Sequence, residues 1–503
     1  MKNCDVLIVG AGPTGLVLAL WLTKLGVPVR ILDKTAEPGT TSRALAVHAR
    51  TLELYEQLGL ADAVMANGLE VAAINLWVSG KHEARVDFGD AGHGLTRYPF
   101  FQMFPQDEHE KLLIARLEQL GVSVERRTEL TGFTDHGDGV TAEITGPTGA
   151  EKIECRYLAG CDGARSRTRE ILGTGFPGGT YQQVFYVADV EASGPPVTGE
   201  LAVDLDQADF LALFPLKGKG RARLIGTVRD ERAEHAEDLK FEDVSDRAIN
   251  NLKVKVEKVN WFSTYRVHHR VSNHFRKGRA FLLGDAAHIH SPVGGQGMNT
   301  GIGDAINLAW KLKWVLDSRA PDHMLDSYEI ERIAFARRLV ATTDRGFTLA
   351  SAEGPMADFF RTKIFPVLLP AAAHFQAFRE FLFRTVSQTL ISYRGDMLSE
   401  GKAGAVSGGD RLPWIAGSEN YKSLSQMIWQ IHIYGTPCPG IAEWCESNKV
   451  LLTLFQWDKR YGEAGLAQDG VYLIRPDSYV ALAEIRAVPH TLEKYFVSRQ
   501  LTP

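Results

Sequence analysis

Three glycines and one acid near the start of the chain have the spacing of a phosphate-binding turn. Gly10, Gly12 and Gly15 form the pattern G-x-G-x-x-G, and Asp33 follows 23 residues after the first glycine (33 − 10). Such glycines let the backbone turn and approach a pyrophosphate at a helix N-terminus, while the acid binds a ribose. The pattern predicts a dinucleotide site rather than a glycine-rich turn of an unrelated α/β unit. The expected contacts are Gly10, Ala11, Gly12, Pro13, Thr14, Gly15, Asp33 and Lys34.

A second glycine loop lies far along the chain. Gly294, Gly295 and Gly297 follow a short apolar run that ends at Gly284-Asp285. A loop of this kind presents backbone N–H groups without side-chain bulk, which suits a flat or anionic ligand. We therefore expect a second ligand-binding loop here.

The segments around both loops predict the elements that position them. Residues 6–9 are typical of a buried parallel strand, 16–25 continue as a helix, and 27–32 form a second strand. The second loop follows a predicted strand at 280–283 and precedes a helix with one apolar face. Each unit has the order strand, glycine loop, helix, so the predicted fold class is α/β.

Composition and charge limit the class of protein. The 503 residues carry 56 Lys and Arg against 61 Asp and Glu, a net charge of -5, and 45% of them are hydrophobic. The acidic excess argues against nucleic-acid binding, and the sequence predicts neither a membrane span nor an export signal. The five cysteines have no C-x-x-C spacing. We expect reduced thiols in a cytoplasmic protein, and no metal site.

A third motif makes the pattern specific. Residues 161–169 read CDGARSRTR, and residues 284–299 read GDAAHIHSPVGGQGMN. Together with the first glycine turn, these stretches resemble the DG and GD motifs of the single-component (class A) flavin-dependent aromatic hydroxylases, the p-hydroxybenzoate hydroxylase-like family. Thr168 departs from the family's DG motif, which usually has Val or Ile before the last arginine.

The resemblance implies a Rossmann-like FAD-binding domain of the GR2 type, interrupted by a mixed-sheet substrate domain. Longer members of the family add a thioredoxin-like C-terminal domain. The expected FAD-binding domain is 1–75, 105–180 and 275–345, and the middle β-sheet domain is 76–104 and 181–274. A helical linker region takes 346–400, and the thioredoxin-like domain takes 401–503.

The C-terminal region has its own sequence signals. The glycines of 404–409 predict a boundary, and 471–474 with 479–482 predict a hairpin whose turn is 475–478. Because the region lacks C-x-x-C, we predict a packing or dimerisation module without a redox role. A homodimer is the family-based expectation.

The family chemistry implies FAD, a transient NAD(P)H and O2. NAD(P)H reduces the flavin, which then forms a C4a-hydroperoxide that hydroxylates a phenolic or other small aromatic substrate. No second G-x-G-x-x-G follows a strand, so NAD(P)H should dock on the outer surface. Two alternatives stay open. One is a monooxygenase of this fold that acts on a polyketide or antibiotic scaffold, including Baeyer–Villiger oxidation, and the other is a catalytically silent flavin or ligand-binding protein.

Single residues match the family's flavin site. Arg43 corresponds to its flavin-contacting arginine and Gln106 to a glutamine at the ribityl chain. Asp285 should bind the ribityl or pyrophosphate region, and Asp162 should brace the loop near the pyrophosphate or the nicotinamide. The segment at the flavin ring should comprise Pro292, Gly295, Gln296, Gly297, Met298 and Asn299. Backbone N–H groups there can stabilise negative charge on the reduced ring.

The candidate catalytic residues are Arg43, His48, Tyr265, Pro292 and Gly295. A phenol reacts faster as a phenolate, so a base helps, and a histidine with a pKa of about 6.5 suits that role. His268 and His288 are further candidates. Hydrogen bonding that shapes the loop is the simpler role for His288.

The middle domain, whose segments 210–215, 221–228 and 261–268 are predicted β-strands, supplies the candidate substrate lining. The expected contacts are Tyr186, Phe210, Ala212, Phe214, Arg223 and Tyr265. Alternate residues of a strand share a face, so Phe210, Ala212 and Phe214 point one way, and the small Ala212 leaves room for a flat ring. Both faces of 210–215 are apolar, however, which fits equally a strand buried between two layers.

Overall fold

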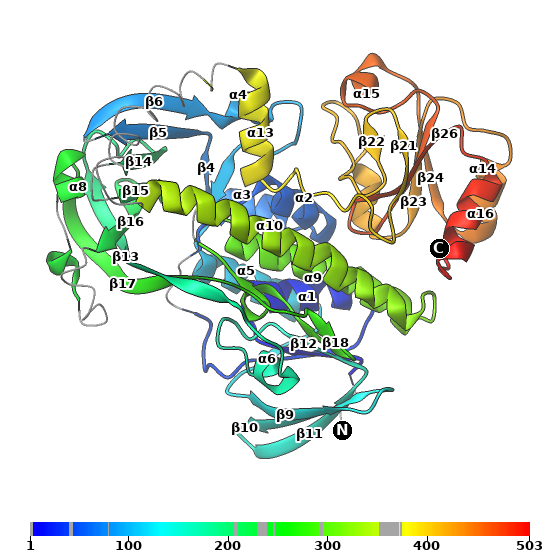
Figure 1. Cartoon of the computed structure of the whole chain (residues 1–503), viewed down its shortest axis with the longest axis horizontal. Helices are drawn as coiled ribbons and strands as arrows, with labels where there is room; N and C mark the ends of the chain where they lie inside the picture. Colours follow the sequence, from blue (N-terminus) through cyan, green and yellow to red (C-terminus); the bar gives the residue numbers. More distant parts are fainter. Residues whose placement is uncertain are drawn as a thin grey trace.

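The computed structural model describes residues 4–39, 44–78, 80–205, 210–228, 239–244, 247–291, 295–351, 372 and 375–503. A parallel sheet with long helices occupies the middle of the molecule (Figure 1). A large curved sheet lies at one end, and the C-terminal residues form another sheet at the other end. The predicted α/β class is confirmed.

The central sheet has the strand order β18-β19-β12-β1-β2-β8, in which only the β18–β19 pair is antiparallel. Its strands are β1 (Val6–Val9), β2 (Val29–Leu32), β8 (Val124–Glu125), β12 (Tyr157–Gly160), β18 (Arg276–Lys277) and β19 (Ala280–Leu282). Every residue of β1 is buried, as expected for a strand covered on both faces. The sheet places the ends of β1, β12 and β19, where the three motifs begin, side by side.

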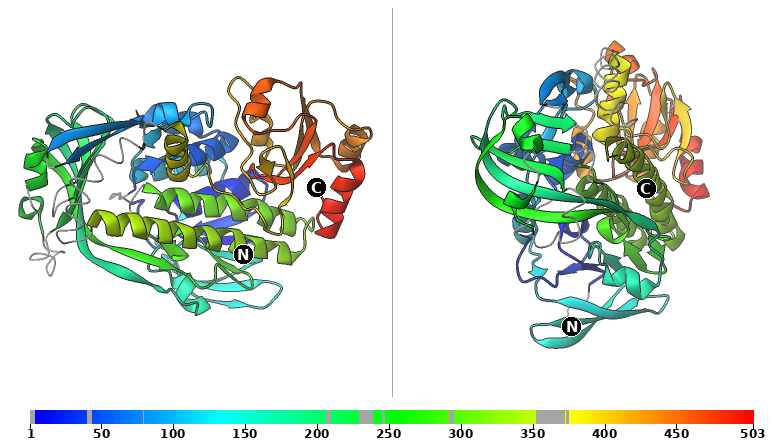
Figure 2. Two further views of the ribbon diagram at one scale, coloured as in Figure 1. Left: turned by 45° about the horizontal axis from the view of Figure 1, so that its top comes forward. Right: turned by 60° about the vertical axis from the view of Figure 1, so that its left-hand side comes forward.

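Helices cover one face of this sheet, and a small antiparallel sheet covers the other (Figures 1 and 2). The helices are α1 (Pro13–Lys24), α5 (Gln106–Gln119) and α9 (Gly297–Leu316), with α10 (Asp326–Ser351) packed on α9. The covering strands are β9 (Glu129–Asp135), β10 (Val140–Gly146) and β11 (Gly149–Cys155). The first helix begins at Pro13, earlier than the predicted residue 16, because a proline needs no hydrogen-bond partner in the first turn.

The eight-stranded sheet has the order β20-β17-β13-β16-β15-β14-β5-β6, and only β14 and β5 pair in parallel. Its strands are β5 (Ala73–Val78), β6 (Lys81–Asp87), β13 (Gly178–Ser193), β14 (Leu201–Leu205), β15 (Phe210–Pro215), β16 (Arg221–Val228), β17 (Lys255–Val271) and β20 (His288–Ile289). The strands predicted at 210–215 and 221–228 are confirmed with the same bounds. Helix α8 (Arg247–Asn251) packs on the outer face.

Shorter elements connect these layers. The helices are α2 (Ala49–Leu58), α3 (Ala61–Asn67), α4 (Phe88–Gly92), α6 (Arg167–Leu172) and α13 (Gln376–Val386). The 3-10 turns are η2 (Phe241–Asp243), η3 (Gly284–Ala286), η5 (Asp322–Leu325) and η7 (Lys422–Gln426). A small sheet has the order β3-β7-β4, formed by β3 (Ala46–Val47), β7 (Phe101–Met103) and β4 (Leu69–Val71). Within the described part of the chain, every helix is too short or too polar to cross a bilayer.

The C-terminal sheet has the order β22-β21-β26-β25-β23-β24. Its elements are β21 (Glu400–Ala403), β22 (Val406–Ser407), β23 (Gln430–Tyr434), α14 (Ile441–Asn448), β24 (Leu451–Phe455), α15 (Lys459–Glu463), β25 (Gly470–Ile474), β26 (Val480–Ile485) and α16 (Pro489–Ser498). The predicted hairpin is confirmed as the antiparallel pair β25–β26. The boundary predicted at 404–409 is wrong, since these residues lie within and after the β21–β22 hairpin, inside the sheet.

Candidate active site

The turn after β1 has three glycines with different purposes. A Cβ on Gly10, whose φ is 104°, would lie 2.3 Å from the Cys161 carbonyl oxygen, and one on Gly15 would lie 2.0 Å from the Gly10 carbonyl oxygen. The packing of β12 and α1 therefore requires both. For Gly12, no heavy atom of the described residues lies within 4 Å of such a Cβ. Its small size instead suits a ligand at the start of α1, and the pyrophosphate of FAD fits there.

Asp33, directly after β2, reaches back to this turn. Its Oδ2 accepts a hydrogen bond from the Ala11 backbone N–H at 2.7 Å, and its Oδ1 accepts from the Thr35 N–H at 2.8 Å. The side chain is half-buried, and the neighbouring Lys34 is exposed. The carboxylate is thus fixed at the edge of the turn, where a ribose-binding acid is expected.

Thr14 joins the first glycine turn to the GD motif. A Cβ on Gly284 would lie 2.7 Å from Thr14 Oγ1, and one on Gly301 would lie 2.3 Å from the same oxygen. The two glycines therefore let the Thr14 side chain pack between η3 and α9. This packing brings the starts of α1 and α9 together, so the two loops that are far apart in the sequence form one site.

Asn299 ties the second glycine loop to the start of α2. Its Oδ1 accepts from the His48 backbone N–H at 2.9 Å and from Thr51 Oγ1 at 2.8 Å. Its Nδ2 donates to the carbonyl oxygens of Ala46 and Gly295 at 2.9 and 3.0 Å. These four bonds use the capacity of the amide. The prediction that Asn299 binds the cofactor therefore has to be corrected for the side chain, which positions the loop.

His48 holds the same loop. Its Nε2 lies 3.1 Å from the Gly295 carbonyl oxygen, and its ring meets the Phe101 ring edge-on with centroids 5.5 Å apart. Gly295 has φ 62°, and a Cβ there would lie 3.2 Å from Ala46 Cβ. Since His48 is only 1% exposed, its geometry favours fixing Gly295 over accepting a proton from a substrate.

A buried ion cluster lies beneath the GD motif and was missed by sequence reasoning. Asp304 Oδ2 lies 2.7 Å from His288 Nε2 and accepts from the Gly284 N–H at 3.0 Å, while Asp304 Oδ1 accepts from Arg332 Nε at 2.6 Å. Burial raises the pKa of the Asp304 carboxyl, but Arg332 and His288 more than offset this, so its pKa lies below the usual value. His288 thus shapes the loop, as its simpler role anticipated. No sequence signal marked Asp304, because it lies two residues from Ile302, on the side of the helix away from the predicted apolar face.

Asp285, in contrast, is exposed at the same motif. It lies between the buried Gly284 and Ala286 in η3, beside the Thr14 contact. This exposed carboxylate lies at the junction of both glycine loops, where the polar chain of a dinucleotide is expected, and it also has a contact within the protein.

The DG motif forms a brace. Asp162 accepts from Ser166 Oγ at 2.5 Å and from the backbone N–H and Oγ1 of Thr168 at 2.9 and 3.0 Å. Thr168, the departure from the family pattern, therefore supplies a hydrogen bond that Val or Ile lacks. Arg169 donates to the Ala286 carbonyl oxygen at 2.9 Å. The motif links β12 to η3, and this role of Arg169 was not anticipated.

Five of the six predicted substrate residues share the inner face of the eight-stranded sheet. Residues directly opposite each other in an antiparallel pair have side chains on the same side. The pairs Phe185–Tyr265, Asp189–Arg223 and Arg223–Phe214 therefore place these side chains on one face. That face comprises Phe210, Ala212, Phe214, Arg223 and Tyr265 among the predicted residues.

Tyr186 is the exception and is withdrawn from the predicted lining. It pairs with Gly226, one residue out of phase with the inner face, and its ring stacks on Phe262 with centroids 6.1 Å apart. The ring also fills the space above Gly226, where a Cβ would lie 2.6 Å from it. Tyr186 therefore belongs to the outer layer of the sheet, which η2 and α8 cover.

Residues 3–343 match the protein family described as FAD binding domain. The chain belongs to this family. It is 38% identical over 373 residues to the 6-methylpretetramide 4-monooxygenase of Streptomyces rimosus, a match that covers 74% of this chain and 65%, just under two thirds, of that protein. It is 31% identical to a flavin-dependent monooxygenase of Mycobacteroides abscessus, across 95% of this chain and 96% of that protein.

The fold agrees with this relationship. The OxyS anhydrotetracycline hydroxylase from Streptomyces rimosus superposes with a TM-score of 0.79 at 29% identity, covering 100% of this chain and 99% of that chain. The predicted class A flavin-dependent hydroxylase family is therefore confirmed, and the chain is a flavoprotein monooxygenase.

In this flavoprotein, two predicted residues hold the segment before β3. Arg223 donates to both carboxylate oxygens of Asp189 at 2.6 and 2.8 Å and to the Ala44 carbonyl oxygen at 3.4 Å. The Gln106 backbone N–H donates to the same carbonyl at 3.2 Å, and Gln106 Nε2 donates to Glu110 Oε1 at 2.8 Å. These bonds give Arg223 a positioning role at Ala44, while its predicted substrate contact stays a prediction.

Arg43 and Pro292 lie outside the described residues. The remaining predicted histidine, His268, lies near the sheet edge with Nδ1 2.7 Å from Thr180 Oγ1. Burial, Arg270 and His269 lower its pKa. Among the described residues, no three His, Cys, Asp or Glu side chains are grouped as a metal site, and all five cysteines are free thiols.

Proposed function

We propose that this chain is an FAD- and NAD(P)H-dependent monooxygenase that hydroxylates a phenolic ring of a polycyclic aromatic compound. The relatives named above act, by their names, on a pretetramide and on anhydrotetracycline, which are fused-ring aromatic scaffolds. A simple phenol is the smaller alternative for the same inner face. Bound FAD supplies the redox chemistry with NAD(P)H and O2.

One structural relationship supports the proposal most directly. Residues 44–47 connect the sheet face to residues 295–301, which include the first turn of α9 and are called the flavin loop below. The Ala44 carbonyl accepts from Arg223, and the Ala46 carbonyl accepts from Asn299. The inner face that carries Phe210 and Tyr265 therefore lies next to the loop that begins α9. An aromatic substrate on that face adjoins the expected position of the flavin ring.

The residues of the site have distinct roles in this proposal. The turn at 10–15 binds the pyrophosphate, and Asp33 binds the ribose. The first N–H groups of α9, at Gly297, Met298 and Asn299, point out of the helix start and stabilise negative charge on the ring. Gln296, which is buried, fixes the helix start through its carbonyl, the acceptor of the Thr300 N–H.

Tyr265 is the candidate that contacts the substrate hydroxyl. It is half-buried on the inner face and packs beside Phe185 with ring centroids 6.0 Å apart. Phe210 belongs to the same small apolar cluster. Apolar side chains around one phenol group exclude water while leaving a hydroxyl to orient a phenolic ring.

We further propose a domain division that follows the sheets, with a thioredoxin-like unit at the C-terminus. There β23, α14 and a parallel β24 are followed by the antiparallel β25 and β26 and by α16. A βαβ unit followed by a ββα unit is the thioredoxin-like arrangement. The free thiols favour a reducing cytoplasmic compartment. A homodimer is the assembly we would test by light scattering.

The test is a coupling assay on the purified full chain. We expect a yellow protein in which phenolic polycyclic compounds accelerate NAD(P)H oxidation and gain one oxygen atom, measured as product formed per NAD(P)H consumed. NADH and NADPH are compared in parallel. A protein that cannot bind added FAD contradicts the proposal. Flavin binding without turnover on any panel member favours the silent alternative, and NMR of the product separates hydroxylation from Baeyer–Villiger oxidation.

A further inference from the structure

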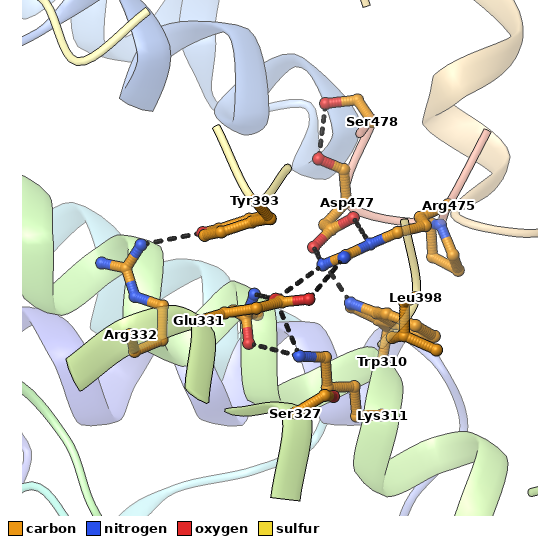
Figure 3. Close-up of polar contacts among 12 residues, drawn as sticks. Trp310, Lys311, Ser327, Glu331, Arg332, Tyr393, Leu398, Arg475, Asp477 and Ser478 are labelled. Atoms are coloured by element: carbon orange, nitrogen blue, oxygen red, sulfur yellow. Dashed lines mark hydrogen bonds and ion pairs between the residues drawn. The ribbon is translucent and has the colours of Figure 1, made fainter. Parts of the chain in front are cut away.

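The turn between β25 and β26 is buried against the FAD-binding region instead of lying exposed. Arg475 is 0% exposed and Asp477 is 2% exposed. Figure 3 shows the two side chains directed toward residues of α9 and α10. A charged hairpin tip that projects from its own sheet and packs against helices of the FAD-binding region calls for a physical reason, because burying charges is costly unless they are paired.

Arg475 makes two bidentate ion pairs. Its Nη1 and Nη2 donate to Glu331 Oε1 and Oε2 at 2.7 and 3.0 Å, and its Nε and Nη2 donate to Asp477 Oδ1 and Oδ2 at 2.9 and 2.6 Å. Glu331 also accepts from Lys311 Nζ at 2.9 Å and from Asn307 Nδ2 at 2.6 Å. Two cations and two carboxylates are thus balanced in a fully buried cluster.

The same turn also forms direct hydrogen bonds with α9 and α2. Trp310 Nε1 donates to Asp477 Oδ2 at 3.1 Å. Arg50 Nη2 donates to the Asp477 carbonyl oxygen and to Ser478 Oγ, each at 2.9 Å. The Pro476 carbonyl oxygen accepts from Gln57 Nε2 at 3.0 Å.

The two helices that the turn contacts, α2 and α9, begin at or beside the flavin loop. Helix α2 starts at Ala49, directly before Arg50, and α9 starts at Gly297. The Asn299 amide joins the two starts, as described above. The hairpin tip therefore holds α9 at its middle and α2 at its first turn, while Asn299 joins the beginnings of the two helices. The two helices are thus held together at two places, at their beginnings and further along.

A second connection runs through α10. Arg332, the neighbour of Glu331, donates to the Thr300 carbonyl oxygen at 3.0 Å and to Asp304. Glu331 and Arg332 thus hold the hairpin tip and the first turn of α9 from adjacent positions. If loss of Arg475 rotated or shifted α10, the hydrogen bond from Arg332 to the Thr300 carbonyl would change as well.

We propose that Arg475 and Asp477 of the C-terminal domain are positioning residues for the flavin loop at 295–301. This inference rests on the proposed flavin site for its consequence, and it gives the C-terminal domain a role in catalysis without redox chemistry. The tip sets the spacing of α2 and α9, and this spacing sets the direction of the N–H groups at the start of α9.

The test measures hydrogen exchange of backbone amides in the apo full chain, so it does not depend on FAD. The variants are Arg475→Met and Asp477→Asn, with Arg475→Lys as the conservative rescue. Arg460→Met is the matched control, because Arg460 lies on the exposed surface of the same domain and its partners, Asp458 and the Ala416 carbonyl oxygen, also belong to that domain. We expect roughly tenfold faster exchange in peptides covering 296–303 for the first two variants, with α1 unchanged.

A merely structural role gives a different pattern. It predicts exchange that rises throughout the C-terminal domain, or throughout the chain, with no selective change at 296–303, and this outcome would overturn the proposal. If Arg475→Met does not fold, the isosteric Asp477→Asn decides. FAD affinity, measured by flavin fluorescence on reconstitution, should fall by roughly tenfold in the same variants. If wild type binds no FAD but the exchange pattern holds, the proposed function fails and the mechanical coupling stands.

Discussion

Asp304 lies 2.7 Å from His288 in surroundings that exclude water from both side chains. The carboxylate also accepts the Gly284 N–H and pairs with Arg332. One side chain therefore fixes the turn of the GD motif, the strand after it and α10. The buried Asp304 carboxylate therefore supports the flavin loop and does not need to contact FAD.

Replacing Asp304 tests that support. We expect Asp304→Asn to lower the free energy of unfolding by about 3–5 kcal/mol, because Arg332 is left as a buried unpaired charge. The measurement is urea denaturation of the apo protein. Asp317→Asn is the control, since the exposed Asp317–Lys313 pair contributes less than about 1 kcal/mol. Equal effects of the two variants would contradict the assigned role.

The three glycines of the first turn should respond differently to alanine. Gly12→Ala should leave apo stability nearly unchanged and weaken FAD binding by about tenfold or more, since the added methyl enters only ligand space. Gly15→Ala should cost about 3 kcal/mol of stability, because its Cβ overlaps the Gly10 carbonyl. Thermal unfolding and FAD titration separate the two effects. A destabilised Gly12→Ala with normal FAD affinity would reverse the assignment.

The buried cluster at the hairpin tip predicts an acid-labile contribution to stability. Burial raises the pKa of Glu331, but Arg475 and Lys311 outweigh it and hold the pKa at about 2. A depressed folded pKa means that the unfolded state binds the proton first, so stability falls as pH decreases from about 4.5 toward 2. The contribution is about 3 kcal/mol. Denaturation at several pH values measures it.

The Glu331→Gln variant supplies the control for that pH dependence. It should be less stable at neutral pH by about 3–5 kcal/mol, because it leaves Arg475 and Lys311 underpaired. It should also lose less stability than wild type between pH 4.5 and 2. An unchanged slope in the variant would mean that other carboxylates govern the acid transition.

Tyr265 and Tyr186 form a matched pair on opposite faces of one sheet. Tyr265→Phe should lower kcat for a phenolic substrate by about tenfold or more if its hydroxyl orients the reacting group, with FAD affinity unchanged. Tyr186→Phe should leave turnover and FAD affinity as in wild type, because Tyr186 lies in the outer layer. Steady-state kinetics and FAD titration distinguish the faces. Loss of turnover in Tyr186→Phe alone would refute the face assignment.

Arg223 and Arg221 provide a similar comparison on β16. Arg223→Met should weaken FAD binding by about tenfold, because the Ala44 carbonyl and Asp189 lose their shared donor. Arg221→Met should have little effect, since Arg221 is exposed. A change in substrate KM with FAD affinity intact would instead support the predicted substrate contact of Arg223.

The sequence alone determined the features that depend on neighbouring residues. Strand, glycine turn and helix at 6–24, and again at 280–316, follow from local patterns, because glycine freedom and helix-start geometry act over a few residues. The bounds of β15 and β16 were also predicted, because the residue pattern of a strand is likewise a local property. The three motifs in order also sufficed for the family.

The tertiary structure decided the partners of the side chains. Both faces of the middle sheet are apolar in sequence, so only strand register showed that Tyr186 faces away from Tyr265. Asn299 and Arg223 carry groups that suit a ligand, yet their partners come from distant segments. The turn at 475–478 has ordinary turn residues, and only the approach of α2, α9 and α10 buries it. Local propensity is a property of short segments, whereas burial and ion pairing depend on which segments the fold brings together.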